Sequence, residues 1–174
     1  LAAYQRSIAI EPTRGGYVNL GVCYYSLGRY AESADMFEKA AALQPKQYQV
    51  WFDLGDAYRW APGQRDKSAG AYDRAIKLAR ESLAVNPNDV YAHVVIASCL
   101  AKRGDLAAAD AEMKIALAHD PTNYRALYQS AVISMLRGDR DAARAWLQRA
   151  IAAGASASDA AHDPELAGIH HGRT

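Results

Sequence analysis

The chain has 174 residues, 51% of them apolar, and no apolar run approaches the ~20 residues needed to cross a bilayer. Its 20 basic and 19 acidic residues are mixed along the chain and give a formal net charge of +1, which argues against a basic stripe that binds nucleic acid. Two cysteines are too few for a disulfide framework, so the fold must depend on an apolar core, which a chain of this length can bury.

Amphipathic stretches with helical periodicity follow one another along the whole chain. They predict helices at residues 1–11, 15–27, 31–43, 48–60, 66–85, 90–102, 106–118, 124–136 and 140–152. Gly28, Gly104 and Gly138 fall in short turns between consecutive helices, where a residue that tolerates positive φ is needed. We therefore expect an all-α chain of helical hairpins.

Prolines mark a repeat. Pro12, Pro45, Pro87 and Pro121 each follow an Ala-rich amphipathic stretch, and Ala155 stands in the fifth equivalent place. The steps between these positions are 33, 42, 34 and 34 residues. Proline is expected just past a helix end because it cannot continue the helix. Each period therefore holds one helical hairpin.

Each period also opens with a fixed pattern of large and small residues. The two clearest copies are Tyr17-x2-Leu20-Gly21-x2-Tyr24 and Trp51-x2-Leu54-Gly55-x2-Tyr58. Weaker copies begin at His93 and Leu127, and Tyr4 and Ser7 are the remains of a truncated first period. This pattern resembles the tetratricopeptide repeat family over roughly residues 1–157.

The resemblance implies a right-handed α-α superhelix with four full hairpins after a partial one. The expected hairpins cover residues 1–13 (partial), 14–47, 48–89, 90–123 and 124–157, and residues 158–174 are expected to form a C-terminal capping segment or tail. No single hairpin can bury its own apolar face, so stacking must supply the stability.

The third hairpin is eight residues longer than the family pattern. Its second helix fits the pattern in two phases, starting at Tyr72 and seven residues later at Ala79. Seven residues make about two helical turns, so we expect a second helix extended by two turns, with Asp66 as its N-cap. The extension is either a tolerated insertion or a protruding edge that contacts a partner or a neighbouring domain.

Two segments are similar to repeat arrays attached to bacterial serine/threonine kinases, adenylate cyclases and winged-helix regulators. They are the long hairpin around Trp60-Ala61-Pro62-Gly63 and the tail Asp163–Ile169. In such arrays a short closing helix covers the last hairpin.

The family resemblance also implies a binding groove along the first helix of each hairpin. Its expected lining is Asn19, Tyr25, Phe52, Asp56, Arg59, Trp60, Tyr91, Lys102, Arg125, Tyr128 and Gln129. Tyr, Trp and Arg supply much of the binding energy of protein interfaces. The alternative is that these residues pack on the neighbouring hairpin.

Other candidate sites carry simpler explanations. His162, His170 and His171 match no zinc spacing, and we expect no metal and no cofactor. No phosphate loop, nucleophile elbow or other catalytic motif is present, so we expect no enzymatic activity. The two Arg-Gly-Asp tripeptides, at Arg103 and Arg137, fall on helix–helix turns, where Gly-Asp is common for conformational reasons.

The sequence therefore predicts a non-enzymatic scaffold that binds a protein or peptide in its groove. The alternative is a regulatory segment of a larger bacterial signalling protein that packs on its own chain or self-associates. Because the sequence opens at Leu1 inside a predicted helix, we expect it to be a fragment of a longer protein. Loss of the leading hairpins would expose the apolar face of the first helix around Leu1, Tyr4 and Ile8, and we expect this exposed edge to promote self-association. We expect the protein in the cytoplasm, or in the periplasm if a membrane anchor lies upstream.

Overall fold

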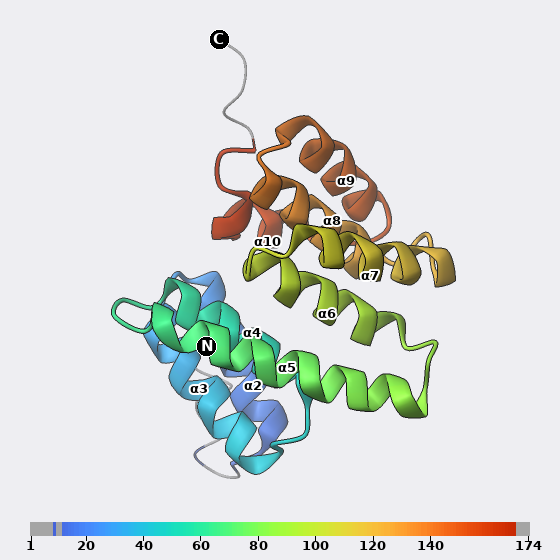
Figure 1. The fold of residues 1–174 in the computed structure, drawn as a ribbon. Coiled ribbons are helices and arrows are strands. Elements are labelled where there is room, and N and C mark those ends of the chain that lie inside the picture. Colours follow the sequence, from blue (N-terminus) through green and yellow to red (C-terminus); the bar gives the residue numbers. More distant parts are fainter. Residues whose placement is uncertain (1–8, 10–11, 170–174) are drawn as a thin grey trace. The chain divides into compact units, whose positions relative to one another are not determined.

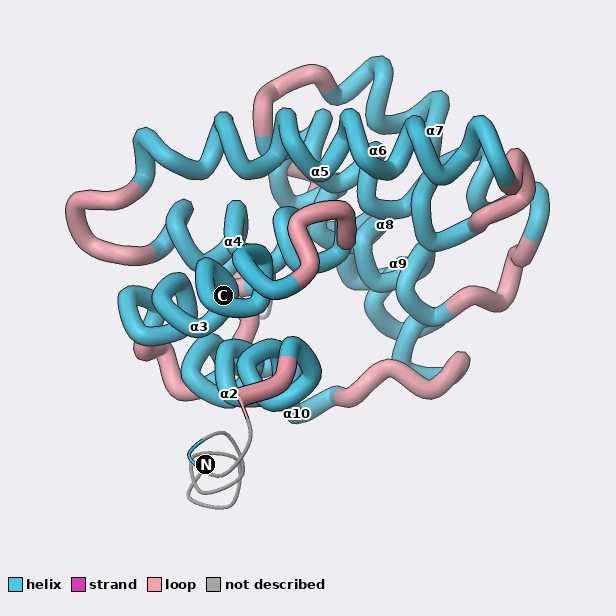
Figure 2. Tube along the Cα trace, turned by 90° about the horizontal axis from the view of Figure 1, so that it is seen from below, coloured by secondary structure: helices cyan, strands magenta, loops and turns pink. Residues whose placement is uncertain are grey.

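The computed structural model describes residue 9 and residues 12–169 (Figure 1). Over these residues the chain consists of helices joined by loops, with no strand (Figure 2). The elements are α2 (Arg14–Ser26), α3 (Tyr30–Leu43), α4 (Tyr48–Trp60), α5 (Arg65–Val85), α6 (Val90–Lys102), α7 (Leu106–His119), α8 (Tyr124–Arg137), α9 (Arg140–Ala152), α10 (Ala157–His162) and the 3₁₀ turn η1 (Pro164–Leu166).

The predicted all-α class and its repeated hairpins are confirmed, and the helix bounds differ by one or two residues at most. The partial hairpin predicted at residues 1–13, with Tyr4 and Ser7, lies outside the described residues except at its last positions. The predicted extended helix is present as α5, which has 21 residues. The prediction that Asp66 caps it is wrong, because Asp66 lies inside the first turn of α5.

The chain divides into two compact units, Leu1–Leu78 and Ala79–Thr174. In unit 1, α2 packs on α3, and α3 packs on α4. Phe37 and Leu54 lie at the centre of its core, each 2% exposed. Small residues opposite large ones let these helices approach, and Ser33 Oγ adds a hydrogen bond of 2.8 Å to Gly21 O.

In unit 2, α6 packs on α7 and α8, and α8 packs on α9 and η1. One apolar cluster joins α6, α7 and α8 through Ala97, Met113 and Ile133. A second cluster joins α8 and α9 to the C-terminal segment, where Leu166 and Ile169 are each 2% exposed. Leu166 and Ile169 therefore share one apolar core with α8 and α9.

The first residue of the repeat pattern makes the same contact in both units. Trp51 Nε1 donates to Pro45 O at 2.9 Å, and His93 Nε2 lies 3.3 Å from Pro87 O. In each case the carbonyl belongs to the proline that follows the preceding helix. The contact explains why a ring with an N–H group recurs six residues after proline.

The α6–α7 and α8–α9 turns of unit 2 share one geometry. Gly104 and Gly138 have φ of 94° and 86°, and the next residue, Asp105 or Asp139, caps the following helix by accepting from Ala108 N or Ala142 N, each at 3.0 Å. A residue in the left-handed conformation ends one helix, and the N-cap directly after it starts the next, so the chain reverses in a short turn. The structure thus supports the conformational explanation of both Arg-Gly-Asp tripeptides.

Candidate functional site

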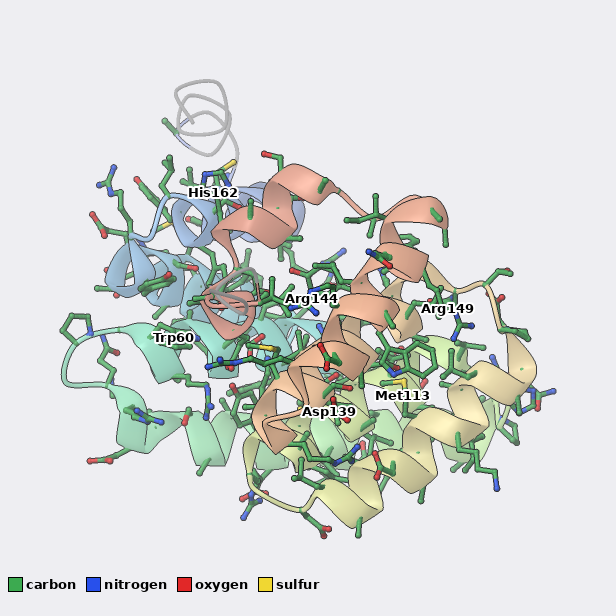
Figure 3. The ribbon with its side chains drawn as sticks, turned by 90° about the horizontal axis from the view of Figure 1, so that it is seen from above. Trp60, Met113, Asp139, Arg144, Arg149 and His162 are labelled. Atoms are coloured by element: carbon green, nitrogen blue, oxygen red, sulfur yellow. The ribbon has the colours of Figure 1, made fainter. Side chains whose placement is uncertain are left out.

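In unit 1 the predicted groove residues lie on α2 and α4. The rings of Tyr25 and Tyr30 are 5.2 Å apart and edge-on, and Tyr30 and Trp60 are 6.3 Å apart. Together these rings connect the end of α2, the start of α3 and the end of α4. Trp60, which is labelled in Figure 3, lies at the end of α4. It is 36% exposed, and Asn19 is exposed on α2. This end of unit 1 therefore presents an aromatic surface.

Two of the predicted residues in unit 1 have packing contacts. Phe52 is only 7% exposed. Asp56 accepts a hydrogen bond of 2.6 Å from Tyr72 Oη, which ties α4 to α5. Arg59 is half-buried in the last turn of α4. The exposed part of the predicted surface is thus smaller than the full set of residues.

A strongly polar contact sits behind this surface. The Tyr58 hydroxyl donates to Glu38 Oε1 at 2.5 Å, from α4 to α3. Burial, and after it the hydrogen bond to Glu38, raise the pKa of the Tyr58 phenol. The phenol therefore stays neutral and fixes α4 against α3.

In unit 2 the predicted residues meet across α6 and α8. The Arg125 guanidinium lies over the Tyr91 ring at 5.4 Å and over the Tyr124 ring at 4.6 Å. Arg125 is exposed, while the two rings are half-buried. Gln129 Oε1 accepts from Ser98 Oγ at 3.1 Å, which adds a second link between the same helices.

The C-terminal segment engages another predicted residue. Tyr128 Oη donates to Asp163 Oδ2 at 2.7 Å, and its ring packs on the cluster that holds Leu166. Arg144 Nη2 adds a hydrogen bond of 3.1 Å to Ile169 O. Lys102 lies half-buried in the last turn of α6. Tyr128 is therefore held by the protein's own chain.

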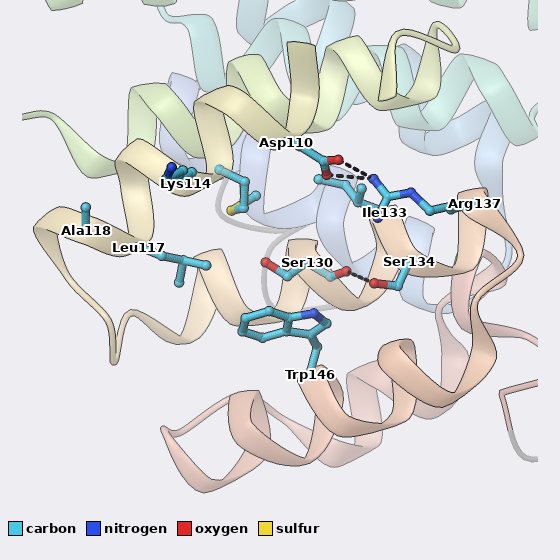
Figure 4. Close-up of a pocket in the computed structure, with 10 residues that line it drawn as sticks. Asp110, Lys114, Leu117, Ala118, Ser130, Ile133, Ser134, Arg137 and Trp146 are labelled. Carbon is cyan, nitrogen blue, oxygen red and sulfur yellow. Dashed lines mark hydrogen bonds and ion pairs between the residues drawn. The ribbon is translucent and has the colours of Figure 1, made fainter. Parts of the chain in front are cut away.

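Unit 2 also holds a pocket that the sequence did not predict, shown in Figure 4. Its volume is about 430 Å³. Its walls come from α7, α8 and α9, and it is lined by Asp110, Met113, Lys114, Leu117, Ala118, Ser130, Ile133, Ser134, Arg137 and Trp146. The available signal was Trp146, a large ring placed directly before Leu147 of the repeat pattern.

The described residues hold neither a metal-binding cluster nor a membrane-spanning helix. Over residue 9 and residues 12–169, no three His, Cys, Asp or Glu side chains group in a way that could hold a metal ion. His162 Nδ1 contacts Ser158 O at 2.7 Å, and His170 and His171 lie outside the described residues. Within the same range, none of the helices has the length and apolar character of a membrane span.

Sequence comparison finds the tetratricopeptide repeat along most of the chain, at residues 16–47, 63–112 and 103–158. Response regulator aspartate phosphatase J of Bacillus subtilis is 41% identical over 70 residues, which cover 37% of this chain and 18% of that protein. Tetratricopeptide repeat-containing protein trd-1 of Caenorhabditis elegans is 31% identical over 83 residues, or 47% of this chain and 10% of that protein. The chain thus spans less than a fifth of either relative.

Two solved structures share the fold. PilW, a type IV pilus biogenesis factor, superposes with a TM-score of 0.57 at 19% identity, over 97% of this chain and 76% of PilW. A thermophilic tetratricopeptide repeat protein of Thermus thermophilus superposes with a TM-score of 0.56 at 22% identity, over 91% of this chain and 82% of that one. At these identities the similarity concerns the fold alone.

Proposed function

Because the chain belongs to the tetratricopeptide repeat family, whose repeats generally bind proteins or peptides, we propose that it is a non-enzymatic scaffold that holds a partner on its first helices. Each unit has its own proposed surface: α6 and α8 in unit 2, and α2 and α4 in unit 1. The observation that carries the proposal is the exposed Arg125 stacked on Tyr91 and Tyr124.

Arg125 has the properties of an interface anchor. The rings of Tyr91 and Tyr124 restrict its guanidinium, so little side-chain freedom is left to lose on binding. Arg125 is exposed, so its N–H groups are accessible to a carboxylate or a carbonyl of a partner. Arg and Tyr are enriched among residues that dominate interface energies. Lys102, Tyr128 and Gln129 extend this surface along the same helices.

The proposed surface of unit 1 is built from Asn19, Tyr25, Arg59 and Trp60. A half-exposed tryptophan supported by tyrosine rings offers a rigid apolar contact with few rotatable bonds. Phe52 is buried, and Asp56 accepts the hydrogen bond from Tyr72, so both hold α4 in the folded unit. We propose the surface around Trp60 as the contact surface of unit 1, separately from that of unit 2.

Affinity capture from a lysate of the source organism tests the proposal. The chain is compared with Arg125→Ala and Trp60→Ala, each checked for an unchanged helical circular dichroism signal. The matched control is Arg29→Ala, because Arg29 also lies over a ring, that of Tyr24 at 4.6 Å, but sits on the α2–α3 turn. A partner lost with Arg125→Ala or Trp60→Ala and kept with Arg29→Ala supports the proposal. A partner kept by all variants overturns it.

A second function is favoured by the contact between Tyr128 and Asp163. There the chain's own C-terminal segment uses a residue of the proposed surface, as expected for a regulatory segment that packs on its own chain. The name of the Bacillus relative also refers to a signalling protein. The sequence of the full-length gene decides between the two: a kinase, cyclase or winged-helix domain in the same chain supports the regulatory segment, and an array alone supports the scaffold.

Self-association through the first helix remains part of this proposal. Leu1, Tyr4 and Ile8, which carry it, lie outside the described residues. Light scattering of the chain at increasing concentration tests it, and a mass that stays monomeric at the highest concentration contradicts it. We place the protein in the cytoplasm, with the periplasm as the alternative.

A further inference from the structure

The pocket on the second helices of unit 2 has an apolar interior. Met113 and Leu117 of α7, Ile133 of α8 and the indole of Trp146 of α9 form its walls. Its two hydroxyls are already satisfied within α8, because Ser130 Oγ donates to Ala126 O and Ser134 Oγ to Ser130 O, each at 2.8 Å. The interior therefore favours an apolar group, because neither hydroxyl needs a hydrogen-bond partner from a ligand.

The rim of the pocket carries an excess of positive charge. Arg137 Nη2 contacts both oxygens of Asp110 at 2.6 Å, so the one carboxylate of the rim is neutralised (Figure 4). Lys114 and, behind the indole, Arg149 have no carboxylate within ion-pair distance among the residues that the structure describes. An acidic group on a ligand complements this rim.

Trp146 is held in place from outside the pocket. The Arg149 guanidinium lies over its ring at 4.4 Å, which fixes the indole and places a third cation next to the apolar wall. The volume of about 430 Å³ lies at the low end of the ~300–1,000 Å³ typical of small-ligand sites, and accommodates one or two apolar side chains.

Small apolar side chains cover the outer face of α7 beside the pocket. Ala107, Ala111 and Ala118 are exposed along the outer face of α7, and Ile115 among them is 41% exposed. Alanine side chains are short, so another backbone can lie close to α7, and exposed apolar groups favour such a contact. A chain segment can therefore run along this helix while it inserts a side chain into the pocket.

We propose that this pocket docks an acidic peptide segment of a partner protein, which inserts a bulky apolar side chain between α7 and α9 and places a neighbouring carboxylate against Lys114. The site lies on the second helices and is separate in its residues from the surface around Arg125. The chain thus has a second contact for a partner of defined chemistry.

The test uses the full 174-residue chain, labelled with ¹⁵N, and three blocked peptides. The first peptide has Leu-Phe between two pairs of glutamates, the second has Leu-Phe between two pairs of lysines, and the third has Gly-Ser between two pairs of glutamates. The readout is the indole N–H resonance of Trp146, assigned with Trp146→Phe. We expect only the first peptide to shift it, in a saturable manner.

Four variants check the residues. Lys114→Glu reverses the rim charge, and we expect it to weaken binding roughly tenfold. Ala118→Phe fills the pocket from an exposed helix position and is expected to abolish binding. Arg140→Glu and Ala152→Phe are the matched controls at exposed positions of α9 outside the lining, and we expect both to bind like the parent.

The outcomes separate the two proposals of binding. Arg125→Ala should leave the first peptide's affinity unchanged, so loss of the Arg125 surface does not remove this site. Equal binding of the glutamate and lysine peptides overturns the proposal, as does binding that survives both Lys114→Glu and Ala118→Phe. No shift of the Trp146 resonance at millimolar peptide also overturns it.

Discussion

Gly21 and Gly55 each face an aromatic ring on the next helix of unit 1. A Cβ atom on Gly21 would lie 2.9 Å from Phe37 Cε1, and one on Gly55 would lie 2.5 Å from Tyr72 Cδ1. The corresponding pairs of unit 2 are Ala97 with Met113 and Ala131 with Leu147, which pack in common clusters. A flexible aliphatic chain leaves room for the alanine methyl that a flat ring excludes.

Gly55→Ala should therefore destabilise the protein, although alanine favours helix formation. Overpacking against Tyr72 costs typically 1–3 kcal/mol, which outweighs a helix-propensity gain of about 1 kcal/mol. Gly70→Ala is the control, because a Cβ at Gly70 of α5 meets no atom within 4 Å. We expect Gly70→Ala to raise the free energy of unfolding by roughly 0.5–1 kcal/mol. Urea denaturation measures both, and equal effects contradict the prediction.

The raised pKa of Tyr58 predicts a loss of stability at alkaline pH. Because the folded state holds the phenolic proton more tightly, the stabilisation is complete below the unfolded pKa of about 10. It is lost as the pH rises from there through the folded-state pKa. We expect the stability advantage of the parent over Tyr58→Phe to be constant near neutral pH and to shrink above about pH 10. Urea denaturation at a series of pH values tests this, and a pH-independent advantage contradicts it.

At the scale of elements, side-chain N-caps fix where helices α6 and α8 of unit 2 begin. Asp89 accepts from Tyr91 N and Ala92 N at 3.1 Å, and Asn123 accepts from Arg125 N and Ala126 N at 3.2 Å. These caps start α6 and α8 one residue before the aromatic or cationic side chain of the proposed surface. Each cap thereby fixes where Tyr91 and Arg125 lie along their helices.

The caps should matter more for stability than the surface ion pairs beside them. Asp139→Ala removes the cap of α9 and should cost about 0.5–2 kcal/mol. Asp141→Ala, two residues later, removes the ion pair between Asp141 and Arg144. Because the Asp141 side chain is 86% exposed, we expect a loss of at most about 1 kcal/mol in the free energy of unfolding. Thermal denaturation followed by circular dichroism measures both variants. A larger effect for Asp141→Ala would contradict this ranking.

At the scale of the whole molecule, the exposed end of a repeat array has to be covered. In unit 2, Leu166 and Ile169 pack in one apolar cluster with residues of α8 and α9. The same segment holds Tyr128 through Asp163. We propose that the segment from α10 to Ile169 caps the array.

Leu166→Ala should accordingly behave like a core substitution. Leu166 is 2% exposed, and we expect a loss of about 2–5 kcal/mol in the free energy of unfolding. Leu27→Ala, at a leucine that is 60% exposed, is the control and should cost well under that amount. Chemical denaturation compares them. Similar small losses for both would show that the C-terminal segment adds little to stability.

The repeat could be predicted from the sequence alone, because the spacing of Gly21, Gly55 and the prolines reflects contacts inside a single hairpin. Local periodicity and turn chemistry were enough for the helix bounds and for the length of α5. The cap of α5 was predicted wrongly at Asp66, since helix starts depend on one or two residues of backbone geometry.

Which residues of the predicted groove are available depends instead on three-dimensional packing. Phe52 is buried, and Asp56 accepts a hydrogen bond from Tyr72 of the next helix. Tyr128 donates a hydrogen bond to Asp163, 35 residues further along the chain. The pocket beside Trp146 could not be predicted from the sequence either, because three different helices, α7, α8 and α9, form its walls. Helix bounds and turns follow from residue spacing along the chain. Which side chains of a helix stay exposed is decided by how the helices pack against one another.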